Sequence, residues 1–258
     1  MKFSIVIPAR NEEKFISGCL ESVRLSAKPY PGDVETIVVL NRCTDGTERI
    51  AAEAGAMIVR EDAKCLARIR NAGARLATGG ILVTIDADSR MPENMLIEVD
   101  RALASGKIIG GGARFRPDRR SLGILVTMVF VRLLTQLLGL AGVSYWCRRG
   151  DFMALGGFNE KMIAGEDLEF AARLKKFGKE RGQRFITLPR ARVTISMRKF
   201  DHFGDWYFLR TLAGRTNRKT ILRWQRGEYN EEDRRFIDEY FYEWDGKPVG
   251  KGDKLMLK

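Results

Sequence analysis

Residues 81–90 read Ile-Leu-Val-Thr-Ile-Asp-Ala-Asp-Ser-Arg, a short apolar run that ends in two carboxylates, Asp86 and Asp88. The apolar run predicts a buried strand, so the two acids are expected where the strand leaves the core. Residues i and i+2 of an extended chain point to the same side, so both carboxylates can face one ligand. Oxygen ligands at such a sheet edge suit a hard divalent cation. The alternative is that the two acids cap a helix or lie in a solvated turn.

The sequence around this run alternates strand and helix patterns as far as residue 115. Repeated β-α units of this length predict a parallel sheet with helices on both faces. Ligands of such sheets bind beyond the carboxyl ends of the strands, where the two acids are expected. The expected strands are 3–7, 35–40, 56–59, 81–85, 108–110 and 113–115, and the expected helices are 12–26, 47–54, 65–77 and 92–105.

The second half of the chain has a different pattern, because residues 122–141 are almost entirely apolar. This stretch is long enough to span a bilayer. Arg132 and Gln136 near its middle argue against a span and favour an interfacial or core-packed helix. The other expected elements are a helix over 165–177 ended by Gly178, short strands at 184–188 and 191–196, and an amphipathic helix over 203–215.

Composition limits the classes of partner and of metal site. The 258 residues carry a formal net charge of +12, which favours nucleic acid, an anionic membrane surface or phosphorylated ligands. A single histidine excludes His-rich metal sites and multi-histidine catalysis. Four widely spaced cysteines indicate free thiols in a reducing compartment rather than structural zinc. No signal peptide precedes the first strand, so the expected location is the cytoplasm, peripheral on the inner face of the membrane.

Basic residues flank the apolar stretch on both sides. A basic flank beside an apolar helix suits binding to an anionic lipid surface. The alternative is a solvated basic face without a partner. The flanking arginines are Arg114, Arg116, Arg119, Arg120, Arg148 and Arg149.

Two polar clusters in the first half carry candidate ligand-binding groups. Residues 8–13 read Pro-Ala-Arg-Asn-Glu-Glu after the first strand, where they hold a ligand or cap the next helix. Arg68 and Arg70 lie on the expected helix before the Asp pair. Arg70 is expected to reach a pyrophosphate near the strand ends, whereas Arg68 fits a solvated surface arginine.

Two clusters in the second half carry candidate catalytic groups. Glu166 and Asp167 start a helix, where a carboxylate caps the helix or acts as a general base. Arg198 or Lys199 is expected to clamp a phosphate. His202 either ligates a metal through its neutral imidazole or has a structural role.

Taken together, these clusters resemble the family 2 glycosyltransferases with the GT-A fold. The order and spacing of the motifs hold from residue 4 to about residue 202. The matching stretches are 4–13, 44–47, 70–73, 85–88, 156–158 and 165–168, followed by Arg173.

The resemblance implies an α/β GT-A fold, a Rossmann-like and mostly parallel sheet flanked by helices, with an acceptor-side subregion. Residues 1–115 would form the nucleotide-sugar-binding half and residues 116–258 the acceptor-binding half of a single GT-A domain. The implied reaction is inverting transfer from a nucleotide-diphosphate sugar to a sugar or lipid-linked acceptor, assisted by Mg²⁺ or Mn²⁺.

The resemblance also assigns roles residue by residue. Asp167 would be the base that deprotonates the acceptor hydroxyl, with Glu166 beside it. Asp88 would hold the metal, and His202 is the second candidate ligand. The residues expected at the donor are Pro8, Ala9, Arg10, Glu12, Asn41, Arg70, Asp86 and Arg198, with Asn41 near the base, Arg70 near the diphosphate and Asp86 near the ribose.

The chain departs from the family pattern in two places. Asn41 stands where the family often has an acid, which leaves the donor base open. The Gln-x-x-Arg-Trp motif of processive members is absent, and residues 221–224 match it only in part. The sequence therefore predicts transfer of single sugars rather than polymer extension.

Other classes of protein remain as alternatives at this stage. Trp206, Tyr207 and Trp224 among arginines would suit a basic nucleic-acid-binding protein, although nucleic acid does not account for the Asp pair. A nucleotide-sugar-binding protein without turnover is the third possibility. A dinucleotide-binding dehydrogenase is disfavoured, because no Gly-x-Gly-x-x-Gly follows the first strand.

Overall fold

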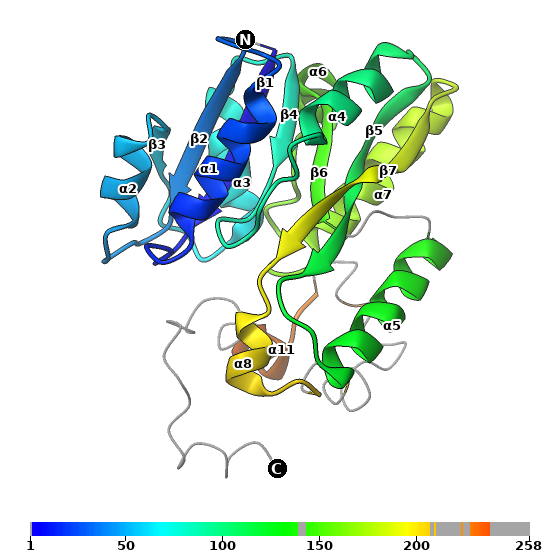
Figure 1. Cartoon of the computed structure of the whole chain (residues 1–258). Helices are drawn as coiled ribbons and strands as arrows, with labels where there is room; N and C mark the ends of the chain where they lie inside the picture. Colours follow the sequence, from blue (N-terminus) through cyan, green and yellow to red (C-terminus); the bar gives the residue numbers. More distant parts are fainter. Residues whose placement is uncertain (1, 139–142, 207–208, 210–222, 224–227, 238–258) are drawn as a thin grey trace. The chain divides into compact units, whose positions relative to one another are not determined.

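The computed structural model describes residues 2–138, 143–206, 209, 223 and 228–237, and it confirms the α/β fold (Figure 1). The strand order in the sheet is β3-β2-β1-β4-β6-β5-β7. The strands are β1 Phe3–Ala9, β2 Val34–Leu40, β3 Met57–Arg60, β4 Ile81–Thr84, β5 Ile108–Pro117, β6 Val143–Arg148 and β7 Arg184–Ile195. The helices are α1 Ile16–Ala27, α2 Thr47–Glu53, α3 Leu66–Leu76, α4 Met95–Ala104, α5 Leu122–Leu138, α6 Arg149–Ala154, α7 Glu166–Glu180, α8 Arg198–Phe203 and α11 Glu231–Ile237.

The sheet is mixed rather than wholly parallel. Strands β3, β2, β1 and β4 pair in parallel, as the β-α pattern predicts. Strand β6 runs antiparallel to both of its neighbours, β4 and β5. The sequence pattern does not predict β6, because its short buried run lacks alternation and follows closely on the apolar stretch 122–141.

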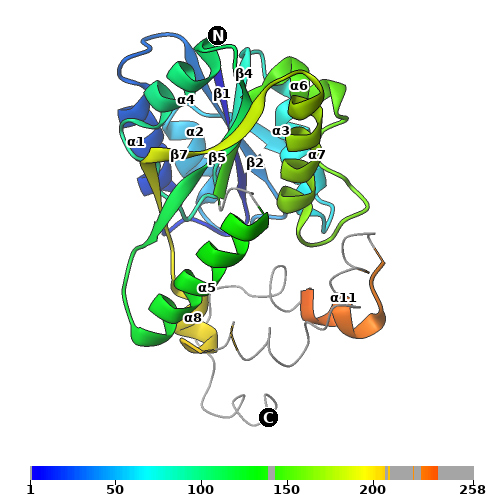
Figure 2. The same cartoon turned by 90° about the vertical axis from the view of Figure 1, so that its right-hand side faces the viewer.

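Helices cover both faces of the sheet, so its central strands are apolar throughout. Phe3, Ile5 and Ile7 of β1 pack with α1 and α4 in one core cluster. Val6 of the same strand points to the opposite face and packs with α3, α6 and α7. Figure 2 shows these two layers on either side of the strands.

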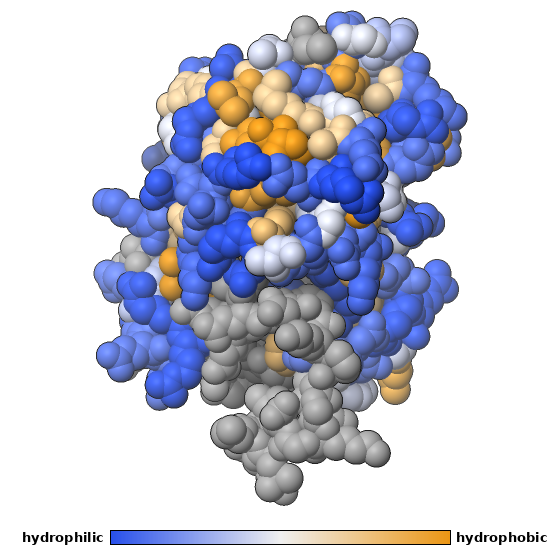
Figure 3. All heavy atoms as spheres, turned by 90° about the vertical axis from the view of Figure 1, so that its left-hand side faces the viewer, coloured by the Kyte–Doolittle hydropathy of each residue, from blue (hydrophilic) through white to orange (hydrophobic). Residues whose placement is uncertain are grey.

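Strand β3 ends the sheet on one side. Its Met57 is 43% exposed, and Arg60 forms an ion pair with Glu48 of α2. Figure 3 faces this side and shows a small apolar patch surrounded by hydrophilic residues. Charged side chains at an edge strand hinder pairing with another chain.

Several expected boundaries are wrong, each for a physical reason. Helix α1 starts at Ile16 rather than Glu12, and residues 13–15 form a turn in which the Phe15 N–H donates to the Glu12 carbonyl. Helix α7 continues through Gly178, where an added Cβ would lie 2.5 Å from Ile109 Cγ2, so this glycine serves close packing and not a helix stop. The two strands expected within 108–115 form one strand, β5, and the pair within 184–196 forms one strand, β7.

The chain forms two compact units, residues 1–116 with 134–195 and residues 117–133 with 196–258. In the second unit Arg119 donates hydrogen bonds to Asp201 and Asp205. Helix α8 ends at Phe203, so the helix expected from 203 does not start there, and most of 207–215 lies outside the described residues.

The apolar stretch is helical from Leu122 to Leu138, as expected, and its last three residues lie outside the described ones. No described helix has the length and apolarity needed to cross a membrane. Within α5, Ile124 and Thr127 are buried, whereas one stripe of apolar side chains is 41–69% exposed. That stripe consists of Leu122, Leu125, Val126, Val129, Phe130 and Leu133.

Candidate active site

The carboxyl ends of β1, β2 and β4 meet at one edge of the sheet, which we call the donor edge because the predicted donor-binding residues lie there. The strand register places Ala9 beside Leu40 and Val6 beside Thr84. Ligands of α/β sheets bind beyond such ends. Pro8 and Ala9 are the buried last residues of β1, and the predicted donor-binding residues of the loops are Arg10, Glu12, Asn41 and Asp86.

The loops after β1 and β2 hold each other in place. The Glu12 N–H donates to Thr47 Oγ1 over 2.7 Å, and the Glu13 N–H donates to Asp45 Oδ2 over 3.1 Å. Asp45 Oδ1 also accepts the N–H of Thr47 at the start of α2. These hydrogen bonds therefore tie the loop after β1 to the start of α2.

Asn41 is buried directly after β2. Its Nδ2 donates to the carbonyls of Glu61 and Ala63 over 2.6 and 2.9 Å, and its Oδ1 accepts from Arg42. The carboxamide thus anchors the loop after β3. Its expected place near a nucleobase stays a prediction.

Arg70 links the donor edge to the acidic start of α7. The side chain extends from α3, is 7% exposed, and donates from Nη2 to Asp86 Oδ1 over 2.9 Å. Its Nη1 donates to Glu166 Oε1 over 2.5 Å. Such burial rules out a solvated surface arginine at this position, whereas Arg68 is exposed beside Glu61.

Glu166 and Asp167, which we call the acid pair, lie in the first turn of α7. The N-cap is Gly165, at φ +74°, which has no side chain, so neither acid is the capping residue. Burial raises the pKa of Glu166 to about 7, against the opposing charge of Arg70. Burial also raises the pKa of Asp167, whose Oδ1 accepts the Leu168 N–H. A carboxylate with a raised pKa suits proton abstraction.

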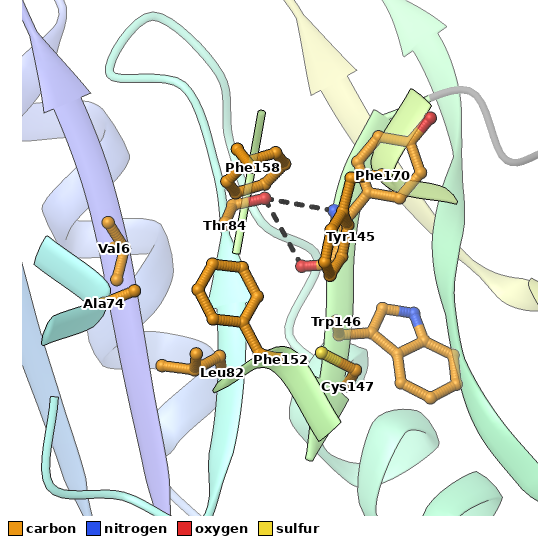
Figure 4. A pocket seen from close by; sticks show the side chains of 10 residues that line it. All are labelled: Val6, Ala74, Leu82, Thr84, Tyr145, Trp146, Cys147, Phe152, Phe158 and Phe170. Atoms are coloured by element: carbon orange, nitrogen blue, oxygen red, sulfur yellow. Dashed lines mark hydrogen bonds between the residues drawn. The ribbon is translucent and has the colours of Figure 1, made fainter. Parts of the chain in front are cut away.

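Tyr145 on β6 is a site residue that the sequence does not reveal. Hydrogen bonds between Thr84 Oγ1 and the Tyr145 main chain hold it beside β4 (Figure 4). Its side chain is 4% exposed. Burial, and after it the charge of Asp167, raises the pKa of Tyr145, so the phenol lies within electrostatic range of the acid pair. Only the long-range pairing of β6 with β4 brings it there.

The end of β4 gathers the negative charge that a cation needs. Burial, and then the charges of Asp88, Asp86 and Glu12, raise the pKa of the Cys19 thiol. Mg²⁺ is usually held by one or two carboxylates together with substrate phosphates. These residues fit an ion that shares its coordination with a ligand. Among the described residues, no three His, Cys, Asp or Glu side chains form a complete metal-binding group.

Arg198 and His202 lie on α8, in the second compact unit. The His202 ring packs edge-on against Phe203, with centroids 4.5 Å apart. Their expected contacts with phosphate and metal stay predictions.

The fold and the site together define a class of enzyme. A sheet edge with two carboxylates, a buried arginine, and an acid pair of which Glu166 is buried suits transfer away from an anionic leaving group. The same GT-A fold occurs in a mannosyltransferase from Pyrobaculum calidifontis, solved in complex with GDP-Man and Mn²⁺. The TM-score is 0.61 at 19% identity, over 99% of this chain and 78% of that one.

Sequence comparison names the family. The profile of glycosyl transferase family 2 matches residues 4–133, half of the chain, and the protein belongs to this family. An uncharacterized glycosyltransferase of Mycobacterium tuberculosis is 31% identical over 111 residues, 43% of this chain and 48% of that protein. An undecaprenyl-phosphate 4-deoxy-4-formamido-L-arabinose transferase of Proteus mirabilis is 30% identical over 131 residues, 45% of this chain and 38% of that protein. The chain thus covers less than half the length of these relatives.

Proposed function

We propose that the protein transfers one sugar, with inversion, from a nucleotide-diphosphate sugar to an acceptor hydroxyl, and that it uses Mg²⁺ or Mn²⁺. The observation that carries this proposal is the Arg70 side chain, which contacts both Asp86 at the donor edge and Glu166 of the acid pair. A donor-binding residue and a candidate base therefore share one site. The complex of the Pyrobaculum mannosyltransferase with GDP-Man and Mn²⁺ supports these ligand classes.

In the proposed reaction Asp167 takes the proton from the acceptor hydroxyl. The hydroxyl oxygen then bonds to the anomeric carbon, and the nucleoside diphosphate leaves with the electron pair of the broken C–O bond. Arg70 stabilises the negative charge that develops on the diphosphate. Asp88 would hold the divalent ion, which when bound would supply further charge neutralisation there. Glu166 keeps Arg70 in place before the donor arrives.

The remaining donor contacts follow the order of the strands. Pro8, Ala9, Arg10 and Glu12 line the nucleoside pocket, and Asn41 lies near the base. The Asp86 carboxylate contacts the ribose once Arg70 turns to the diphosphate. Arg198 is proposed as a phosphate contact and His202 as a second metal ligand.

The exposed stripe on α5 supports a lipid-linked acceptor at an anionic membrane surface. Its residues repeat at helical spacing, so the helix can lie in the interface with this stripe towards lipid. Arg120, two residues before the helix, is exposed and supplies positive charge. The name of the Proteus relative includes undecaprenyl-phosphate, a lipid phosphate.

Vesicle sedimentation tests the membrane contact. Wild-type protein should sediment with phosphatidylglycerol vesicles at low salt and less with phosphatidylcholine vesicles. Leu125→Asp should abolish sedimentation, while Met57→Asp, at an exposed methionine of the β3 edge, should not. Equal sedimentation of all three proteins would contradict the contact with α5.

A thermal-shift screen of nucleotide sugars tests the donor proposal. A bound donor raises the melting temperature according to its binding free energy. The shift should require Mn²⁺ or Mg²⁺ and should be lost in Asp88→Ala. If no nucleotide sugar changes the melting temperature of the protein, with or without metal, the proposed function is contradicted.

A further inference from the structure

The turn between α6 and α7 has two successive glycines in the left-handed region. Gly156 has φ +74° and Gly157 has φ +69°. A Cβ on Gly157 would lie 2.6 Å from Asn71 Oδ1, closer than atoms pack. Glycine at this position therefore lets the Asn71 side chain approach the main chain of the turn.

Asn71 hydrogen-bonds to both main-chain polar groups of Phe158, the residue after Gly157, as a neighbouring β-strand would. Its Nδ2 donates to the Phe158 carbonyl over 2.9 Å, and its Oδ1 accepts the Phe158 N–H over 2.9 Å. The Nδ2 also donates to Glu160 Oε1 over 3.0 Å. Asn71 is 6% exposed, so these bonds are made away from water.

Arg173 holds the same turn from the other side. It lies on α7 and donates from Nη1 to the Leu155 carbonyl over 2.8 Å and from Nη2 to the Gly157 carbonyl over 2.7 Å. Glu169, one turn earlier on α7, accepts from Arg173 Nε over 2.6 Å and fixes the guanidinium. The planar fork thus ties the turn to the helix that begins with the acid pair.

The Phe158 side chain completes the connection. Its ring packs against Phe152 of α6 and Phe170 of α7, with centroids 5.5 and 4.8 Å apart (Figure 4). The Arg70 guanidinium lies 5.6 Å from the Phe158 ring centroid. Helix α3, the turn and helix α7 therefore meet at one buried residue, whose backbone Asn71 holds.

We propose that Asn71 and Arg173 are positioning residues, which fix the Glu166–Asp167 pair relative to Arg70. Asn71 follows Arg70 on α3, and Arg173 shares α7 with the acid pair, so the turn joins two rigid helices that carry the reacting groups. The inference rests on the proposed function, because it holds that Asn71 and Arg173 position the proposed base and do not bind the donor. Loss of either contact should impair the transfer step and spare donor binding.

Two substitutions test the proposal, with kcat for transfer and donor affinity by thermal shift measured for each. Asn71→Asp keeps an acceptor for the Phe158 N–H but loses both donated bonds and faces the Glu160 carboxylate. Arg173→Lys keeps the charge but loses the fork. Each variant should lower kcat roughly 10- to 100-fold, because a small misplacement of a reacting group costs about this much. Donor affinity should stay within about twofold, since the donor edge is untouched.

Arg75→Ala is the matched control, because Arg75 also lies on α3 and contacts Glu160, but from the exposed side. It should leave kcat unchanged. Unchanged kcat in folded Asn71→Asp and Arg173→Lys, or an equal loss of kcat and donor affinity, would overturn the proposal. If Asn71→Asp does not fold, Arg173→Lys decides alone. A wild-type protein that neither binds a donor nor transfers a sugar would instead overturn the proposed function.

Discussion

The donor edge and the acid pair lie in the same compact unit but are assembled in different ways. Each donor loop directly follows a strand of a consecutive β-α unit, so its place comes from the local chain. The acid pair depends on contacts between distant residues: 96 positions separate Arg70 from Glu166, and 87 separate Asn71 from Phe158. Substitutions in the two regions should therefore separate donor binding from transfer.

The largest expected effect is on the acid pair. Asp167→Asn removes the proposed base while keeping its shape, and transfer should fall roughly 10²- to 10⁴-fold. Donor affinity should remain close to that of the wild type. Asp88→Ala should also reduce transfer by orders of magnitude, but with loss of metal-dependent donor binding. Steady-state transfer and donor thermal shift, measured together, distinguish the two.

Asp33→Asn serves as the control, because Asp33 is an exposed aspartate before β2. It should change neither quantity. Wild-type turnover in Asp167→Asn would remove Asp167 as the base. Equal loss of donor affinity in both site variants would contradict the separation of the two regions.

The same difference explains what the sequence can predict. The donor residues could be found because an apolar run followed by polar residues, such as the run that ends at Asp86, marks a strand end locally. Glu166 and Asp167 could be found only as acids at a helix start. Tyr145 could not, because no local pattern shows that β6 pairs with β4, and Asn71 could not, because its partner is a main-chain turn far along the chain.

The next effect is on stability, at the arginine that joins the two regions. Arg70→Met leaves Glu166 buried without its cation, which should cost roughly 3–5 kcal/mol of unfolding free energy near pH 8. The loss should shrink towards pH 5, because the native state then keeps Glu166 protonated. Chemical denaturation at both pH values measures this difference.

The direction in which the unfolding free energy changes with pH follows from proton linkage. Burial raises the folded-state pKa of Glu166 to about 7, above its unfolded value. Between these two pKa values the native state binds more protons than the unfolded state, so stability falls as pH rises. Without Arg70 the pKa of Glu166 in the folded protein rises further, so the fall in stability extends to higher pH. The double variant Arg70→Met/Glu166→Gln should recover most of the stability at pH 8, and no recovery would argue against the buried pair.

Activity should follow the acid pair rather than the donor edge as pH changes. A base acts only when deprotonated, so kcat should fall as pH drops through the raised pKa values of Glu166 and Asp167. About tenfold is expected for each pH unit below the midpoint, and the midpoint belongs to the pair as a whole. Donor thermal shifts over the same range should change less. A pH–rate profile flat from pH 5 to 8 would contradict a base in this environment.

The smallest effect is expected where the donor edge relies on local hydrogen bonds of Asp45 at the start of α2. Asp45→Ala removes the acceptor for the Thr47 N–H at the start of α2, which should cost about 1 kcal/mol. Although burial opposes it, hydrogen bonding from Thr47 and Glu13 keeps the pKa of Asp45 below its usual range. The stability it contributes is present above the unfolded pKa and is lost as pH falls, so the difference from wild type should shrink near pH 3. Asp62→Ala, at an exposed aspartate on the loop after β3, is the control and should change stability little. Because these hydrogen bonds lie on the donor side, Asp45→Ala should weaken donor binding before it changes kcat, the reverse of the order expected for Asn71→Asp.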